Sequence, residues 1–113
     1  MSCLFCRIIH QEIPATILHE TEHVLAFRDI APRAPAHLLI VPKEHIATLN
    51  DTTPEHQWVL GHMVHTATTL AQTLGIADSG YRLIMNCNDD GGQTVFHIHL
   101  HLLGGRALTW PPG

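Results

Sequence analysis

The chain has few basic residues and no long apolar run. It carries 6 lysines and arginines against 10 aspartates and glutamates, which gives a net charge of −4. Without a basic footprint, we expect no nucleic-acid duplex as a partner. No apolar segment approaches the roughly 20 residues of a membrane span, and no basic stretch leads into an apolar one as in a signal peptide. We therefore expect a cytoplasmic protein that binds no membrane.

The length of 113 residues predicts a single domain over residues 1–113, because no repeat or linker interrupts the chain. Hydrophobic residues make up 45% of the sequence, enough for a core. A domain this small buries only a limited share of its surface. A second copy of the chain would bury an apolar helix face and a sheet edge that otherwise stay exposed. We therefore expect a homodimer with two-fold symmetry.

The apolar pattern predicts an α+β fold, with a five-stranded antiparallel sheet, one short helix and one long helix. We expect the short helix at 3–10 and strands at 16–19, 23–28, 37–41, 81–85 and 95–103. Thr53-Pro54 opens the long helix, because threonine caps helices and proline suits their first position. Apolar residues recur at helical spacing as far as Leu74, and Gly75 supplies the stop.

The segment 96–103 alternates three histidines with apolar residues, as a strand with one buried face does. Side chains two apart in a strand point to one side at about 6.6 Å spacing, which would bring His97, His99 and His101 together. Three imidazoles on one face suit a metal site, a proton relay or a phosphate site. With 11 histidines in the chain, chance gives such a window about one time in ten, so the surrounding residues must decide.

The segment 86–94, which precedes the histidines, is rich in groups that bind anions. Gly91 and Gly92 let the backbone approach a ligand and turn its N–H groups toward an anion. Gln93 and Thr94 add side-chain donors. Taken alone, these residues favour an ordinary hairpin turn. Beside a histidine face, they favour an anion site.

The motif Cys3-Leu4-Phe5-Cys6 leaves three interpretations open: half of a zinc site, a redox pair or two packed thiols. A redox pair would need a thioredoxin-like βαβ setting, which the pattern of predicted elements lacks. A zinc site needs two further ligands. The spacing of the two cysteines does not identify them.

Together these motifs resemble the histidine-triad family, and more narrowly its Hint branch of nucleotide-binding phosphoramidases. The resemblance covers nearly the whole chain and rests on separated segments in the same order. These are 27–32, 35–43, 80–86, 91–106 and the end Trp110-Pro111-Pro112-Gly113. The related Fhit branch, which hydrolyses dinucleoside polyphosphates, fits less well because of Gly104-Gly105-Arg106 and the Trp-Pro-Pro-Gly end.

The resemblance implies that the protein hydrolyses the P–N bond of purine nucleoside 5′-phosphoramidates through a nucleotidyl-histidine intermediate. It assigns the nucleophile to the central His99, since a neutral imidazole meets a charged phosphate without repulsion and forms a labile product. His101 would donate to the phosphate oxygens or the leaving amine. His97 and His37 would hold the array. This chemistry requires no cofactor.

The resemblance also assigns a nucleotide site. Asp29 would accept from both ribose hydroxyls, whereas by itself it would be interpreted as a turn carboxylate before Ala31-Pro32. The apolar base slot is expected from Leu4, Phe5, Ile8, Ile13, Phe27 and Leu39. The remaining predicted contacts are Ile30, Asn86, Gly92, Gln93, Thr94 and Val95.

Two further expectations follow from the resemblance. Relatives with a C-x-x-C pair bind structural zinc through a histidine after the Pro-Lys segment and through the first triad histidine. Here those positions are His45 and His97, which would join Cys3 and Cys6 in a four-ligand site. Trp110 would approach the nucleotide pocket of the neighbouring subunit.

The same residues would also suit an alternative function, a nucleotide-binding regulatory module whose hydrolysis is incidental. The sequence favours an enzyme, because both the nucleophile and the phosphate loop are intact. Neither the physiological substrate nor a preference between adenine and guanine follows from the residues.

Overall fold

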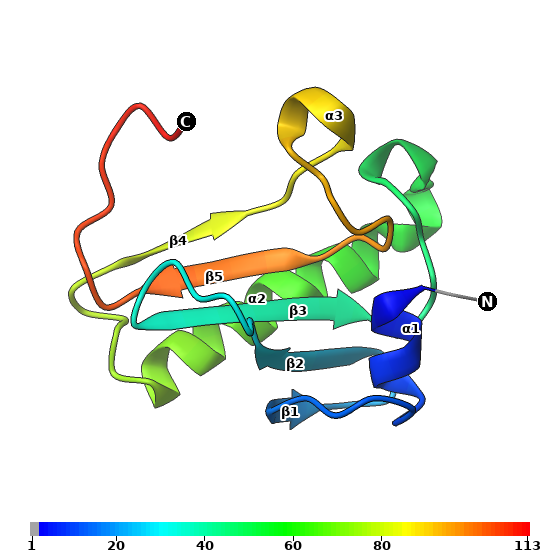
Figure 1. The fold of residues 1–113 in the computed structure, drawn as a ribbon, viewed down its shortest axis with the longest axis horizontal. Coiled ribbons are helices and arrows are strands. Elements are labelled where there is room, and N and C mark those ends of the chain that lie inside the picture. The colour runs from blue at the N-terminus through cyan, green and yellow to red at the C-terminus, as the bar shows by residue number, and fades with distance from the viewer. Residues whose placement is uncertain (1–2) are drawn as a thin grey trace.

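The computed structural model describes residues 3–113 and is built on one sheet of five strands. The strands are β1 (Ile17–Glu20), β2 (Val24–Arg28), β3 (Ala36–Pro42), β4 (Tyr81–Ile84) and β5 (Leu100–Gly104). Every neighbouring pair is antiparallel, in the order β1-β2-β3-β5-β4. The strand β5, which carries His101, therefore lies inside the sheet (Figure 1), and the predicted five-stranded antiparallel α+β fold is confirmed.

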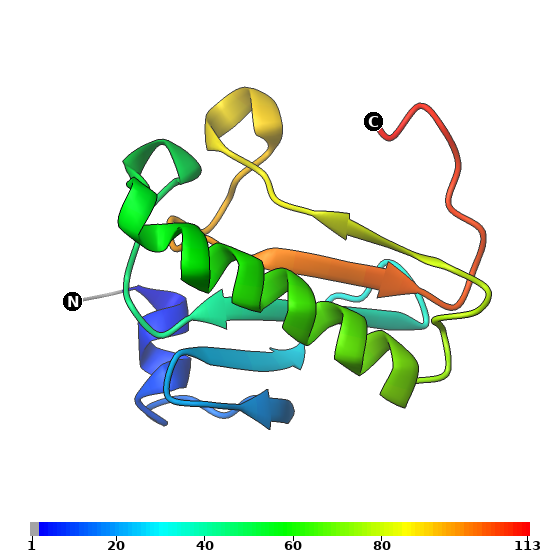
Figure 2. The same cartoon turned by 180° about the vertical axis from the view of Figure 1, so that it is seen from behind.

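Helices cover both faces of this sheet. The short helix α1 (Leu4–Ile9) lies on the face turned to the viewer in Figure 1, and the long helix α2 (Gln57–Thr73) crosses the opposite face in Figure 2. Short 3₁₀ turns, η1 (Leu49–Asp51) and η2 (Pro54–His56), precede α2. The predicted start at Thr53-Pro54 is thus the start of η2. Within residues 3–113, no helix is both long and apolar enough to cross a membrane.

Alternation along β3 divides the core into two layers. Leu38 and Ile40 face α2, where they pack with Met63 and other apolar residues. Leu39 and Val41 face α1 and pack in a second cluster. All seven residues of β3 are buried because both faces of the sheet are covered. The catalytic candidates lie on the α1 side of this strand.

The backbone that carries the histidines differs from the predicted strand 95–103. β5 begins only at Leu100, opposite Ile40, and residues 95–99 are irregular. Strand β3 ends at Pro42, which has no N–H to offer a ladder. Instead, the Ile98 N–H donates to the carbonyl of Ile46 at 2.8 Å. The predicted strand is therefore too long at its start, because apolar alternation reports burial and does not reveal a pairing partner.

The segment before the histidines, for which the sequence predicts a loop, holds a short helix, α3 (Asn88–Gly91). Gly92 ends this helix with φ at 82°. Glycine adopts this left-handed conformation without the steric cost that a Cβ brings. The segment therefore crosses from β4 toward the histidines as a compact helical loop.

Candidate functional site

A groove of about 260 Å³ opens on the α1 side of the sheet. All six residues predicted for the base slot line it: Leu4, Phe5, Ile8, Ile13, Phe27 and Leu39. Asp29, Ile30, Thr94 and Val95 line it as well, together with His99 and His101. The fold thus brings apolar side chains, a carboxylate and two imidazoles to one cavity.

Other predicted nucleotide contacts lie outside the lining of this groove, namely Asn86, Gly92, Gln93 and Trp110. Gln93 is only 6% exposed, and its amide oxygen accepts from the Asn88 N–H at 2.9 Å. Its amide nitrogen donates to the carbonyls of Ala47 and Val95. In this structure the amide of Gln93 holds the loop, and its part in binding a phosphate stays a prediction.

Some lining residues were not identified from the sequence. Pro14, Ala15 and Arg28 contribute to the groove. Pro14 and Ala15 directly follow Ile13, which the prediction did include. Arg28 is the last residue of β2 and directly precedes Asp29. This position is the only sequence feature that could have indicated its place in the groove.

His99 is buried, and one of its ring nitrogens is held by the backbone. Its Nδ1 lies 2.8 Å from the carbonyl of His97 and must donate to it, so Nε2 keeps its lone pair. The Phe5 ring packs edge-on at 5.0 Å between centroids. Burial lowers the pKa of His99, so the ring is neutral at neutral pH. A neutral imidazole with a free nitrogen is equipped to act as a nucleophile.

A chain of hydrogen bonds also fixes the proton positions of His37 and His101. The Arg33 N–H donates to Nδ1 of His37 at 3.0 Å, so the proton of this ring is on Nε2. That Nε2 lies 3.0 Å from Nδ1 of His101, which accepts, and the proton of His101 is therefore on Nε2. Burial, with smaller effects of His99 and His37, lowers the pKa of His101 to about 4. At pH 7 this ring is a neutral N–H donor.

Asp29 closes a turn and also faces the groove. Its Oδ1 accepts from the Ala31 N–H at 2.8 Å, the bond expected of a turn carboxylate. Its Oδ2 lies 3.4 Å from Nε2 of His37. The side chain is 20% exposed and lines the groove. The turn interpretation and the ligand-binding interpretation of this residue are therefore compatible.

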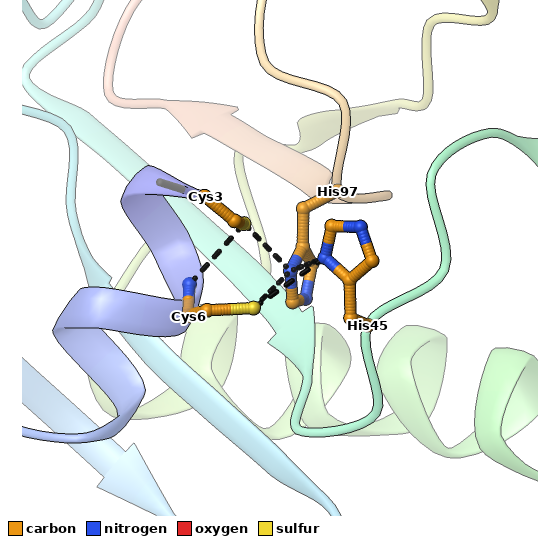
Figure 3. Close-up of side chains that lie close together, drawn as sticks. All are labelled: Cys3, Cys6, His45 and His97. Carbon is orange, nitrogen blue, oxygen red and sulfur yellow. Dashed lines mark hydrogen bonds between the residues drawn. The ribbon is translucent and has the colours of Figure 1, made fainter. Parts of the chain in front are cut away.

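Cys3, Cys6, His45 and His97 converge where α1 meets the segment before β5 (Figure 3). Their ligand atoms all lie within 4.8 Å of one another. Cys3 is the N-cap of α1, and its Sγ accepts from the Cys6 N–H. His97 donates from Nε2 to the carbonyl of Pro42 at 2.8 Å, so its Nδ1 turns a lone pair toward the thiols.

This cluster has the geometry of a tetrahedral metal site. Zinc bonds of about 2.3 Å to sulfur and 2.0–2.1 Å to nitrogen place neighbouring ligand atoms roughly 3.3–3.7 Å apart. The N–S and N–N separations in the cluster are 3.2–3.6 Å. Burial and the neighbouring Cys3 raise the pKa of Cys6 to about 11. At neutral pH and without a bound cation, the Cys6 thiol is therefore protonated.

Comparison with known proteins identifies the family. The family model of the HIT domain matches residues 10–108. The purine nucleoside phosphoramidase of Escherichia coli strain K12 is 53% identical over 105 residues, which are 93% of this chain and 88% of that protein. A HIT family hydrolase from Legionella pneumophila superposes with a TM-score of 0.97 at 56% identity, over 99% of this chain and 100% of the other.

A second similar structure is a Zn-bound histidine triad family protein from Mycobacterium smegmatis. It is 35% identical, with a TM-score of 0.81, over 94% of this chain and 76% of that one. The protein described here therefore belongs to the histidine-triad (HIT) family, as its motifs predicted. Within this family it is a hydrolase of the HIT type.

Proposed function

We propose that the protein hydrolyses purine nucleoside 5′-phosphoramidates to a nucleoside monophosphate and an amine, as one HIT domain over residues 1–113. The observation that carries this proposal is the free Nε2 of His99 in a groove that also holds an apolar slot and Asp29. The name of the relative from Escherichia coli supports the same substrate class.

The groove offers a separate partner to each part of a purine nucleotide. The base enters the apolar slot whose lining includes Phe5 and Phe27, two rings that pack edge-on against each other at 5.5 Å. The ribose hydroxyls donate to Asp29. The phosphate then reaches His99 and His101, with Thr94 beside it.

The reaction proceeds in two displacements at phosphorus. Nε2 of His99 attacks, the P–N bond breaks, and its electron pair leaves with the nitrogen, which takes up a proton. The Nε2–H of His101 donates to a phosphate oxygen or to the leaving nitrogen. Water then attacks the nucleotidyl-His99 and releases the monophosphate and the free imidazole. These steps use no cofactor.

We also infer a structural zinc held by Cys3, Cys6, His45 and His97, because the separations and the aimed lone pair of His97 fit that ion. Bound zinc would supply a cross-link between α1 and the segment before β5, and it would keep both thiols deprotonated. Zinc-bound thiols suit a reducing compartment, which fits the cytoplasmic location that we propose.

Substrate turnover tests the proposed function. Wild-type protein should hydrolyse adenosine 5′-phosphoramidate much faster than diadenosine polyphosphates, which the alternative Fhit-type activity would favour.

A hydrogen bond to a charged group is worth about 1.5–3 kcal/mol. The 2′,3′-dideoxy analogue should therefore lose about 10–150-fold in kcat/KM, and Asp29→Ala should remove most of this discrimination.

Asp78→Ala is the matched control, because it removes an exposed carboxylate that does not line the groove. It should discriminate against the dideoxy analogue as the wild type does. A preference for diadenosine polyphosphates would overturn the proposed substrate class. Equal discrimination in Asp29→Ala and the wild type would remove Asp29 from the ribose site.

We further propose that the protein is a homodimer, joined through α2 and β4 about a two-fold axis, with Trp110 at the partner's groove. β4 is an edge strand, and an edge exposes unpaired backbone groups that a second strand can satisfy. Val64 on α2 is 43% exposed, and Trp110 in the C-terminal tail is 80% exposed. A second copy of the chain would cover these apolar surfaces.

Light scattering should give twice the 12.5 kDa of one chain. Trp110→Ala should remain dimeric and change selectivity between substrates by about 2–10-fold, the value of one aromatic contact. Mixed dimers of Trp110→Ala with His99→Ala distinguish the two arrangements. In such a dimer the Trp110→Ala chain keeps His99 and holds the one active site, whereas the His99→Ala chain keeps Trp110. The active site has wild-type selectivity if Trp110 acts on the partner, and altered selectivity if Trp110 acts within its own chain. A fully active monomer would contradict both halves of the proposal.

A further inference from the structure

Arg106, two residues after β5, is bound to the loop that precedes β3. Its Nε and Nη2 both donate to the carbonyl of Arg33, at 3.0 and 2.8 Å. Its Nη1 donates to the carbonyl of Ala107 at 3.0 Å. The guanidinium group thus ties the end of the histidine-bearing strand to the loop 31–35.

Gly105 brings the two segments close enough for these bonds. It has a φ of 90°, and a Cβ at this position would lie 2.9 Å from Cβ of Pro35. Glycine permits both the backbone conformation and the close approach. The pair Gly105-Arg106 therefore packs directly against the loop 31–35.

The same loop residue sets the protonation pattern of the active site. Arg33 accepts from Arg106 at its carbonyl and donates to Nδ1 of His37 from its N–H. That N–H forbids a proton on Nδ1 of His37, so Nε2 of His37 donates to His101. Nε2 of His101 then carries the proton that faces the substrate.

If this N–H moves away, only the Oδ2 of Asp29, at 3.4 Å, still favours a proton on Nε2 of His37, and the opposite proton arrangement becomes accessible to the pair. His37 could then carry its proton on Nδ1 and accept at Nε2, with His101 donating from its own Nδ1. His101 would present a bare nitrogen to the groove, which cannot donate to a phosphate oxygen or to a leaving amine. The Arg33 N–H thus favours the arrangement in which His101 is a donor.

We propose that Arg106 is a positioning residue that holds the Arg33 N–H on His37 and thereby selects the tautomer in which His101 donates to the substrate. Arg106 does not touch the substrate itself. The kinetic part of this inference rests on the proposed phosphoramidate hydrolysis. The hydrogen-bond part depends on the fold alone.

Nuclear magnetic resonance tests the hydrogen-bond part without substrate. Scalar couplings between nitrogens across N–H···N bonds should join Arg33 to Nδ1 of His37, and Nε2 of His37 to Nδ1 of His101. We expect both couplings in the wild type and their loss or weakening in Arg106→Ala. Arg33→Ala is the matched control, since it removes one positive charge from the same loop but keeps the N–H and the carbonyl.

A second control addresses the C-terminal tail, which begins at Arg106. Arg82 donates to the carbonyls of Leu108 and Thr109, so Arg82→Ala loosens the tail without touching Arg33. Both couplings should persist in this variant. Arg106→Lys and Arg106→Gln each keep a donor for the Arg33 carbonyl and serve as further variants if Arg106→Ala does not fold.

In kinetics, Arg106→Ala should lower kcat by about tenfold or more, because misplaced proton donors are costly, while KM changes by less than about twofold. Arg106→Lys should recover part of kcat. Intact couplings in Arg106→Ala, or lost couplings with unchanged kcat, would overturn the inference. If the couplings behave as expected but the wild type hydrolyses no phosphoramidate, the proposed function fails and the positioning role stands.

Discussion

Replacement of His99 by alanine should reduce phosphoramidate turnover by roughly 10⁴–10⁶-fold, the usual cost of losing a nucleophile. The reason is geometric as well as chemical. Nδ1 of His99 donates to the carbonyl of His97, and this leaves Nε2 with a free lone pair in a residue that lines the groove. Because burial lowers the pKa of His99, the attacking nitrogen stays unprotonated at neutral pH. The variant should still bind adenosine monophosphate.

Rapid quenching of wild-type protein during turnover should trap a nucleotide on His99. Mass spectrometry of the corresponding peptide identifies the modified residue, and the adduct should be absent from His99→Ala. His65→Ala is the matched control, because His65 is exposed on α2 and does not line the groove. A near-normal rate in His99→Ala, or an adduct on another residue, would mean that the two-step mechanism is wrong.

The general architecture was accessible from the sequence. The pattern of apolar residues located the first four strands to within a residue at each end, because the covered faces of a sheet impose that pattern. The long helix and its glycine stop followed from the same reasoning. The irregular backbone in the first half of the segment 95–103 could not be predicted in this way. Pro42 ends the neighbouring strand, and the Ile98 N–H bonds to the carbonyl of Ile46 instead.

This irregular backbone explains why neighbouring histidines face different surroundings. A regular strand would send His97 and His99 to the same side. In the structure His97 directs a nitrogen to the two cysteines, whereas His99 lines the groove. The histidine spacing indicated a site, but the division of the triad between two sites depends on backbone that no local pattern specifies.

The proton positions could not be predicted either, because they depend on which backbone groups the folded chain brings to each ring. The carbonyl of Pro42 fixes the His97 ring, and the N–H of Arg33 fixes the His37 ring. Gln93 presents the same difficulty, since its amide is taken up by carbonyls that include that of Ala47. Side-chain types predicted which residues gather, whereas the fold decides which of their atoms remain free.

The double substitution Cys3→Ser/Cys6→Ser should abolish zinc binding and destabilise the protein. Elemental analysis of wild-type protein purified without chelator should show close to one zinc per chain. At a free zinc concentration of about 1,000 times Kd, binding stabilises a fold by about 4 kcal/mol. For a chain of this size, its loss should lower Tm by more than about 10 °C. Cys87→Ser, which changes the free cysteine outside the cluster, should retain both the zinc and the Tm.

Loss of zinc should also weaken nucleotide binding more than it slows the chemical step. The helix α1 has only 6 residues, too few to be stable without tertiary contacts. It carries Leu4 and Phe5 of the base slot between the two cysteines, and the Phe5 ring packs on both His97 and His99. Without the metal, α1 should loosen and KM should rise several-fold, with a smaller change in kcat. Wild-type protein that is free of metal and equally stable would show that thiol and imidazole packing alone holds the helix.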